Sequence, residues 1–155
     1  YPLAPQVAQA IAQFWTRAGV NTKVEVVPFV IYSGKANKNE YAMSVIGWGN
    51  GTGEASYAMV TILATFNADK GLGASNWGRY SNAKLDQALD EASQEFDDAK
   101  REAILRRGVK IVADDVGIIP LFHYKNIWAT KKGIKVVTWT SDRTVAMQAT
   151  PVPAK

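Results

Sequence analysis

Residues 41–57 read Tyr-Ala-Met-Ser-Val-Ile-Gly-Trp-Gly-Asn-Gly-Thr-Gly-Glu-Ala-Ser-Tyr, and this stretch sets the class of fold that we expect. Its first half, residues 42–46, is a short and mostly apolar run, which predicts a strand buried on at least one face. Four glycines then alternate with other residues, and so many glycines indicate a backbone path that side chains would block. After Gly53, apolar residues recur at helical spacing, at Ala58, Ile62 and Phe66. A strand, a glycine-rich turn and a helix in this order are typical of ligand-binding edges in α/β proteins.

The glycines fit neither of the two common phosphate-binding motifs. A dinucleotide fingerprint has glycines at relative positions 0, 2 and 5, and counting from Gly47 or Gly49 the last falls on Thr52 or Glu54. A P-loop ends in Gly-Lys-Ser/Thr, whereas here Gly53 precedes a glutamate. That carboxylate would also repel a phosphate from the start of the following helix. Two interpretations stay open: a ligand-binding loop, or a flexible surface loop anchored by a buried tryptophan.

Helices and strands are predicted to alternate along the rest of the chain. Apolar residues at helical spacing predict a helix at residues 7–18, and Gly19 just past its end suits a left-handed cap. Asn82 and Asp97 are typical N-caps for two further helices. Their inward faces are expected to carry Leu85, Ala88, Leu89, Ala92 and Phe96 in the first helix, and Ile104, Gly108, Ile111 and Val112 in the second.

Apart from the strand at residues 42–46, the expected strands are short and lie towards the two ends of the chain. The remaining predicted features are strands at residues 20–26, 118–122 and 127–130, a turn at 131–133, a short helix or loop at 32–40, and a long irregular connection at 67–82. Because helix and strand alternate, the fold class predicted from the pattern is α/β.

Composition excludes several classes of protein. The 155 residues include no cysteine, so disulfides, thiolate metal sites and cysteine nucleophiles are excluded. The net charge of +4 is uneven: residues 1–96 hold seven basic and eight acidic residues, and residues 97–155 hold eleven and six. The basic residues are scattered without an aromatic stripe, so we expect no nucleic-acid partner. No apolar run approaches the length of a membrane span, and the first residues show no basic start followed by an apolar run, so we expect no signal peptide within these 155 residues.

Candidates for catalysis are few. His123 is the single histidine, and a lone histidine is more often a packed or exposed residue than a catalyst. There is no Gly-x-Ser-x-Gly elbow, and no histidine or cysteine spacing suits a metal. Neighbouring carboxylates occur in three pairs, and solvation or helix capping explains each of them. The pairs are Asp86/Asp90, Asp97/Asp98 and Asp114/Asp115.

Four aromatic residues, Trp48, Tyr57, Trp77 and Tyr80, lie in or beside the two glycine-rich stretches. If these two loops meet, the rings make an adaptable apolar wall for a ligand, with polar groups of Asn50, Thr52, Asn76 and Glu54 beside it. Alternatively, each ring covers part of the core. The sequence pattern leaves both interpretations open.

Four pieces of the chain carry a resemblance to a known family. They are Ile-Ala-Gln-Phe-Trp at 11–15 running to Ala18-Gly19-Val20, then Ile46-Gly47-Trp48-Gly49, then Gly-Arg-Tyr-Ser-Asn-Ala-Lys-Leu-Asp at 78–86, and Lys100-Arg101 leading to Asp-Asp-Val-Gly-Ile-Ile-Pro-Leu at 114–121. In order and spacing, over nearly the whole chain, they resemble the C-terminal part of the large solute-binding proteins of ABC importers, the family that binds oligopeptides, dipeptides and nickel chelates.

The resemblance implies a periplasmic-binding-protein-like lobe of type II, with a mixed sheet flanked by helices. Family members are two-lobed clamps several times longer than this chain, so the chain is expected to be a fragment. Residues 1–120 would form most of the C-terminal ligand-binding lobe. Residues 121–155 would return to the N-terminal lobe of the intact protein.

The resemblance also implies a binding site, because the stretch after the tryptophan lines the ligand cleft in the family. The expected ligand-binding residues are Trp48, Gly49, Asn50, Gly51, Thr52 and Glu54. Peptide-binding members carry an aspartate shortly after the tryptophan to hold the ligand's amino group, and an acidic residue followed by proline beyond it. Here Gly51 stands three residues after Trp48, and Glu54-Ala55 replaces the acidic-proline pair. We expect Glu54 to substitute as the ammonium anchor, although this departure weakens the case for a peptide with a free amino terminus.

The expected function is therefore capture of a peptide or similar small solute and its delivery to membrane permease subunits, without enzymatic activity, cofactor or metal. The expected location is the periplasm, or the outer face of a bacterial membrane to which the protein is tethered. A rival hypothesis is a self-contained enzyme domain that uses His123 with a nearby carboxylate. An interaction module that uses the basic C-terminal part is a third.

Overall fold

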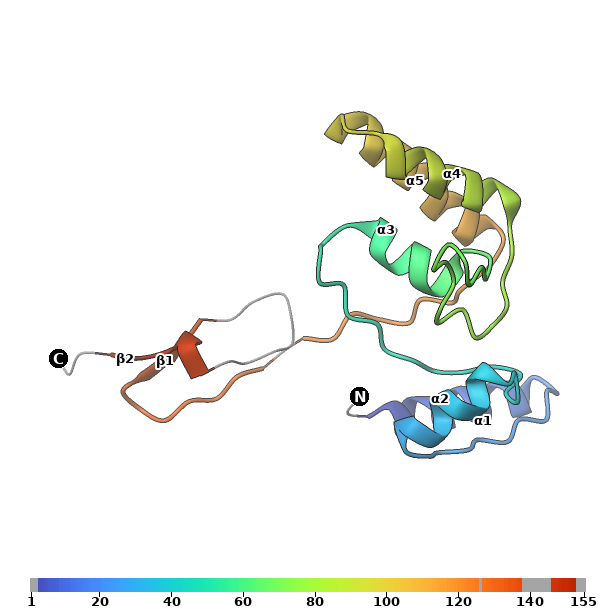
Figure 1. The fold of residues 1–155 in the computed structure, drawn as a ribbon. Helices are drawn as coiled ribbons and strands as arrows, with labels where there is room; N and C mark the ends of the chain where they lie inside the picture. Colours follow the sequence, from blue (N-terminus) through green and yellow to red (C-terminus); the bar gives the residue numbers. More distant parts are fainter. Residues whose placement is uncertain (1–2, 126, 138–145, 153–155) are drawn as a thin grey trace.

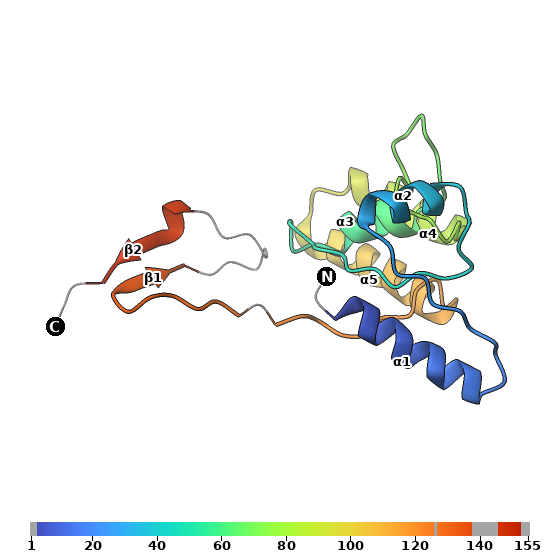
Figure 2. The same cartoon turned by 90° about the horizontal axis from the view of Figure 1, so that it is seen from below.

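The computed structural model describes residues 3–125, 127–137 and 146–152. Within these residues, five α-helices lie in this order: α1 (Ala4–Arg17), α2 (Phe29–Asn37), α3 (Ala55–Ala58), α4 (Ala83–Gln94) and α5 (Asp98–Asp114). A π-helix, η1 (Met59–Leu63), continues α3. Near the C-terminus follow β1 (Ile134–Val136), the 3₁₀ helix η2 (Ala146–Gln148) and β2 (Ala149–Pro151). Helix α4 packs against α5, and α5 contacts α3 and η1, whereas the chain after α5 runs away from the helices to the β1–β2 pair (Figures 1 and 2).

Helix α1 ends as its sequence predicts. Gly19 adopts a φ of 90°, in the left-handed region. The Gly19 N–H donates to the Thr16 carbonyl at 3.0 Å, and the Val20 N–H donates to the Trp15 carbonyl at 2.8 Å. This pair of bonds is the Schellman motif, which satisfies carbonyls that the helix end would otherwise leave unpaired.

Helices α4 and α5 are likewise started by the predicted caps. The Asn82 Oδ1 accepts from the backbone N–H groups of Lys84 and Leu85, and the Asp97 Oδ1 accepts from that of Lys100 at 2.9 Å. The prediction of these two helix N-termini is confirmed. The irregular connection before α4 is held by Asn76, which is 3% exposed and whose amide donates to the carbonyls of Ala64 and Tyr80.

The core lies where η1, α4 and α5 meet. Its buried members are Met59, Ile62, Leu63, Ala64, Leu85, Leu89, Ala92, Leu105 and Val112. Gly108 allows α5 to approach closely, because an added Cβ would lie 3.2 Å from the Met59 Sδ and 3.4 Å from a Leu85 methyl. Phe96 was expected on the inward face of α4 but is 95% exposed. The helix ends at Gln94, so the helical register that the pattern assumed does not reach it.

The predicted strands at residues 20–26, 42–46, 118–122 and 127–130 are not formed; these residues are irregular. The sheet of the described residues is a single antiparallel pair, in which Ile134 lies opposite Pro151 and Val136 opposite Ala149. A strand is stable only when a neighbouring strand pairs with its backbone, and in the described part of the chain none of these segments is paired as a strand. The expected mixed sheet flanked by helices is therefore corrected to a helix-rich fold with a two-stranded sheet, which is compatible with the α/β class.

Candidate functional site

The glycine-rich loop at residues 47–53 leads from an irregular segment into α3. Gly53 has a φ of 74°, which a residue with a side chain rarely adopts. At Gly49 and Gly51, in contrast, an added Cβ would meet no atom within 4 Å. Contacts within the described protein therefore do not explain these two glycines. Glycine is also used where another molecule comes close to the backbone, because it has no side chain to block that approach.

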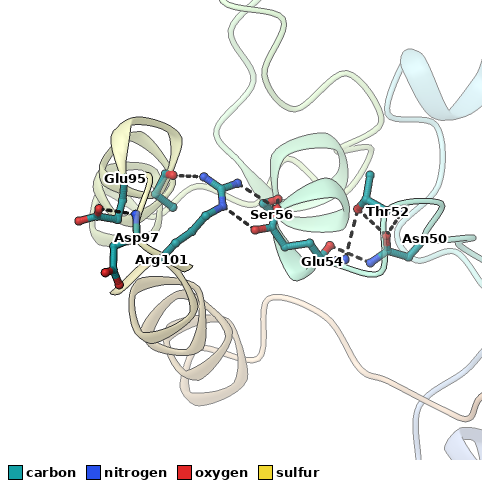
Figure 3. A network of polar contacts seen from close by, with 8 residues as sticks. Asn50, Thr52, Glu54, Ser56, Glu95, Asp97 and Arg101 are labelled. Atoms are coloured by element: carbon teal, nitrogen blue, oxygen red, sulfur yellow. Dashed lines mark hydrogen bonds and ion pairs between the residues drawn. The ribbon is translucent and has the colours of Figure 1, made fainter. Parts of the chain in front are cut away.

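Asn50 organises this loop through its side chain (Figure 3). The Asn50 Oδ1 accepts from the backbone N–H groups of Thr52 at 3.2 Å and Gly53 at 3.1 Å, and from the Thr52 hydroxyl at 3.0 Å. The Asn50 amide donates to the Glu54 carbonyl at 2.8 Å, and the Thr52 hydroxyl accepts from the Glu54 N–H. The polar side chains of Asn50 and Thr52 are thus used inside the loop, which fixes the conformation in which its backbone is presented.

Glu54 connects this loop to Arg101 of α5. Its carboxylate accepts two bonds from the Arg101 guanidinium, Nε to Oε1 at 2.5 Å and Nη2 to Oε2 at 2.9 Å. Ser56 donates to the same carboxylate, and Arg101 also donates to the carbonyl of Ala92 near the end of α4 (Figure 3). The hydrogen bonds from Arg101, and then that from Ser56, lower the pKa of Glu54 from 4.5 to about 2. Glu54 is therefore ionised at neutral pH and its charge is matched by a partner.

Trp48 lies between this loop and the core. Its half-buried ring packs against the core, and it meets the Tyr57 ring with centroids 6.1 Å apart and planes tilted by 40°. The indole Nε1 is buried and has no hydrogen-bond partner among the described residues. A buried N–H without a partner costs free energy, and groups of this kind are rare in folded proteins.

The four aromatic residues of the two glycine-rich stretches lie in three places. Trp48 pairs with Tyr57, as above. Trp77 instead packs edge-on against Tyr32 of α2, with centroids 5.2 Å apart, and donates to the Asn37 side chain at 2.7 Å. The Tyr80 hydroxyl donates to Asp115 just after α5 at 2.9 Å. Trp48 and Tyr80 pack against the core, whereas Trp77 packs on α2, so the four rings do not form one continuous wall.

Arg101 was missed as a site residue in the sequence reasoning. It is separated from Glu54 by 47 positions, a distance over which no local pattern pairs them. A signal was nevertheless present. Residues 101, 105, 108 and 112 share one face of the predicted helix, and the last three are buried. An arginine that continues an apolar face needs a polar partner, and Glu54 is that partner.

The remaining candidate residues do not favour an enzymatic function. His123 is exposed, and within the described ranges it forms no ion pair or hydrogen bond with a carboxylate. Groups of three or more metal-ligating side chains are likewise absent from those ranges. None of the helices described is long and apolar enough to cross a membrane.

Comparison with known proteins places the loop inside a family match. Residues 1–70 match the family described as bacterial extracellular solute-binding proteins, family 5 Middle. The oligopeptide-binding protein OppA of Bacillus subtilis is 23% identical over 133 residues, which are 85% of this chain and 23% of that protein. The periplasmic oligopeptide-binding protein OppA of Haemophilus influenzae is 25% identical over 133 residues, or 84% of this chain and 23% of that protein.

A third relative, the di/tripeptide-binding protein 1 of Pseudomonas aeruginosa, is 22% identical over 122 residues, or 79% of this chain and 22% of that protein. The chain thus spans about a quarter of the length of the curated relatives that it matches. No solved structure matches it significantly. The resemblance to family 5 solute-binding proteins, predicted from the motifs, is confirmed.

Proposed function

We propose that this chain is part of the substrate-binding component of an ABC importer, and that it captures a peptide or a similar small solute. The observation that carries the proposal is the family match at residues 1–70, because it includes the whole loop from Trp48 to Glu54. The relatives support a peptide as the solute, since their names describe binding of oligopeptides or of di- and tripeptides. Capture requires no covalent chemistry. The solute then passes to permease subunits in a bacterial membrane, from the periplasm or from a tethered position outside the cell.

The proposed ligand-binding residues are those of the loop: Trp48, Gly49, Asn50, Gly51, Thr52 and Glu54. Trp48 supplies a flat surface for stacking, and its unpartnered Nε1 is a donor that a solute or a solute-bound water can satisfy. The open space at Gly49 and Gly51 supports approach of a solute to the backbone N–H and C=O groups. Glu54 supplies negative charge, and a cationic group of the solute would join its existing ion pair with Arg101.

We further propose that residues 1–120 belong to one ligand-binding lobe of type II and that residues 121–155 return to a second lobe. Burial along the chain supports this division. Val112 is the last residue that is buried in the described part of the chain. Beyond it, Ile119, Leu121 and Phe122 are about half exposed, and a packing partner for them is what a second lobe would provide.

The experiment that tests this function starts from the complete product of the gene that encodes this chain. Native mass spectrometry of the purified protein reports any solute that copurifies, and calorimetry with a library of di- to pentapeptides measures affinity directly. We expect a bound peptide or peptide-like solute in at least one of the two measurements. A protein that binds none of these, and carries no other small molecule, would overturn the proposal.

The role of Trp48 is tested by making the same substitution, tryptophan to phenylalanine, at Trp48 and at Trp77. Trp48→Phe keeps an aromatic ring but removes the unpartnered donor and part of the stacking surface. We expect the affinity to fall about tenfold, on the scale of a single aromatic contact or hydrogen bond. Trp77→Phe is the matched control, because Trp77 is half-buried in a different aromatic group. Equal affinities of the two variants, measured by calorimetry, would remove Trp48 from the site.

A further inference from the structure

Arg101 contacts both Glu54, directly after the glycine-rich loop, and the end of α4. Its guanidinium binds both carboxylate oxygens of Glu54 and the carbonyl of Ala92. The side chain is about three-quarters buried, in contrast to the strongly exposed Arg106 of the same helix. Two parallel N–H···O bonds fix the angle of the carboxylate as well as its distance, so Arg101 restrains Glu54 in direction and in place.

Glu54 passes this restraint to the loop through its own backbone. The Glu54 N–H donates to the Thr52 hydroxyl, and the Glu54 carbonyl accepts from the Asn50 amide. Asn50 in turn holds the N–H groups of Thr52 and Gly53. A continuous chain of hydrogen bonds therefore runs from α5 to the residues that follow Trp48. The glycines make the loop flexible in its backbone, so its order depends on this chain.

We propose that Arg101 is a positioning residue: through Glu54 it holds the glycine-rich loop in one conformation. The consequence for solute binding rests on the function proposed above, since an ordered loop loses less entropy when a solute binds. The positioning itself is a property of the protein without solute. The two proposals therefore fail in different experiments.

Hydrogen exchange of the complete, solute-free gene product tests the positioning. In Arg101→Gln we expect the amides of residues 52–54 to exchange about tenfold faster than in the wild type, which corresponds to the loss of one charge-assisted hydrogen bond. Arg101→Lys keeps the charge but not the bidentate geometry, so it should restore only part of the protection. Arg106→Gln is the matched control, because it breaks an exposed pair with Glu102 on the same helix and should leave the loop unchanged.

Two outcomes would overturn the proposal. One is unchanged exchange of residues 52–54 in Arg101→Gln. The other is faster exchange that extends equally to α4 and α5, which would give Arg101 a role only in overall stability. If the loop responds as expected but the wild type binds no solute, the positioning holds and the proposed function fails.

A pH series provides a second readout. The charged side chains that line the groove beginning at Glu54 are Asp98, Arg101, Glu102, Arg106 and Lys110, all on α5. Because the pKa of Glu54 is lowered to about 2, the protection is expected to be complete above pH 4.5 and to be lost as the pH falls towards about 2. In Glu54→Gln the loop should exchange quickly at every pH in this range. Protection that persists in that variant, after correction for intrinsic rates, would contradict the proposal.

Discussion

The helical unit at residues 55–115 and the described residues between 118 and 133 are both rich in apolar side chains, yet only the first buries them. Leu85 is 0% exposed, whereas Phe122 is 53% exposed and Ile127 is 90% exposed. The helices close their hydrogen bonds within their own segments. The residues between 118 and 133 form no helix, and in the described chain they are not paired as a strand either. In this molecule, therefore, apolar side chains are buried in the region whose backbone forms its hydrogen bonds within its own helices.

The largest expected effect separates these two regions. Leu85→Ala removes buried methyl groups from the core, and we expect it to lower the free energy of unfolding by about 3 kcal/mol. Phe122→Ala removes a larger side chain from the exposed segment, and in the 155-residue chain measured by itself a change below about 0.5 kcal/mol is expected, as for surface positions. Urea denaturation of both variants checks this. A loss at Phe122 as large as that at Leu85 would mean that the segment packs against another part of the protein.

A pair of glycines sharpens the comparison within the irregular connection before α4. Gly73 and Gly71 have nearly equal φ values, of 64° and 66°, so an alanine at either one is strained. At Gly73 the added Cβ would also lie 2.5 Å from the Ala64 carbonyl oxygen, whereas at Gly71 it would meet nothing within 4 Å. We expect Gly71→Ala to cost about 1 kcal/mol and Gly73→Ala about 3 kcal/mol. Equal thermal midpoints would show that the backbone there yields to relieve the contact.

The smallest effect concerns the start of α4. Asn82→Ala removes the acceptor for the N–H groups of Lys84 and Leu85, and a loss of about 1 kcal/mol is expected. Asn82→Ser keeps an acceptor at the cap without adding a charge beside Asp115 and should be close to the wild type. Circular dichroism during thermal unfolding measures both. If the two variants lose stability equally, the bond that Asn82 donates to Asp115 contributes more than the cap.

Much of the helical part was predictable because its signals are local. Gly19, Asn82 and Asp97 mark helix ends by their own backbone and side-chain chemistry, and Leu85, Ala88, Leu89 and Ala92 form one face by spacing alone. Phe96 shows the limit of spacing, because it follows the last residue of the helix.

The strands were not predictable in the same way. Alternation at residues 20–26 shows that a segment suits a sheet but says nothing of whether a partner lies beside it. The candidate site depends partly on local sequence features and partly on contacts between distant residues. Trp48 and its glycines were visible in the sequence, while the pairing of Glu54 with Arg101 depends on how α5 packs. The contact of Trp48 with solute stays a prediction.

The irregular segment at residues 118–122 is also expected to affect how the protein behaves when it is concentrated. Exposed apolar residues outside a sheet can pair with the same segment of another molecule and grow into fibres. Pro120 lies in the middle of this segment, and it has no backbone N–H with which to continue such a ladder. We therefore expect Pro120 to oppose self-association through this stretch.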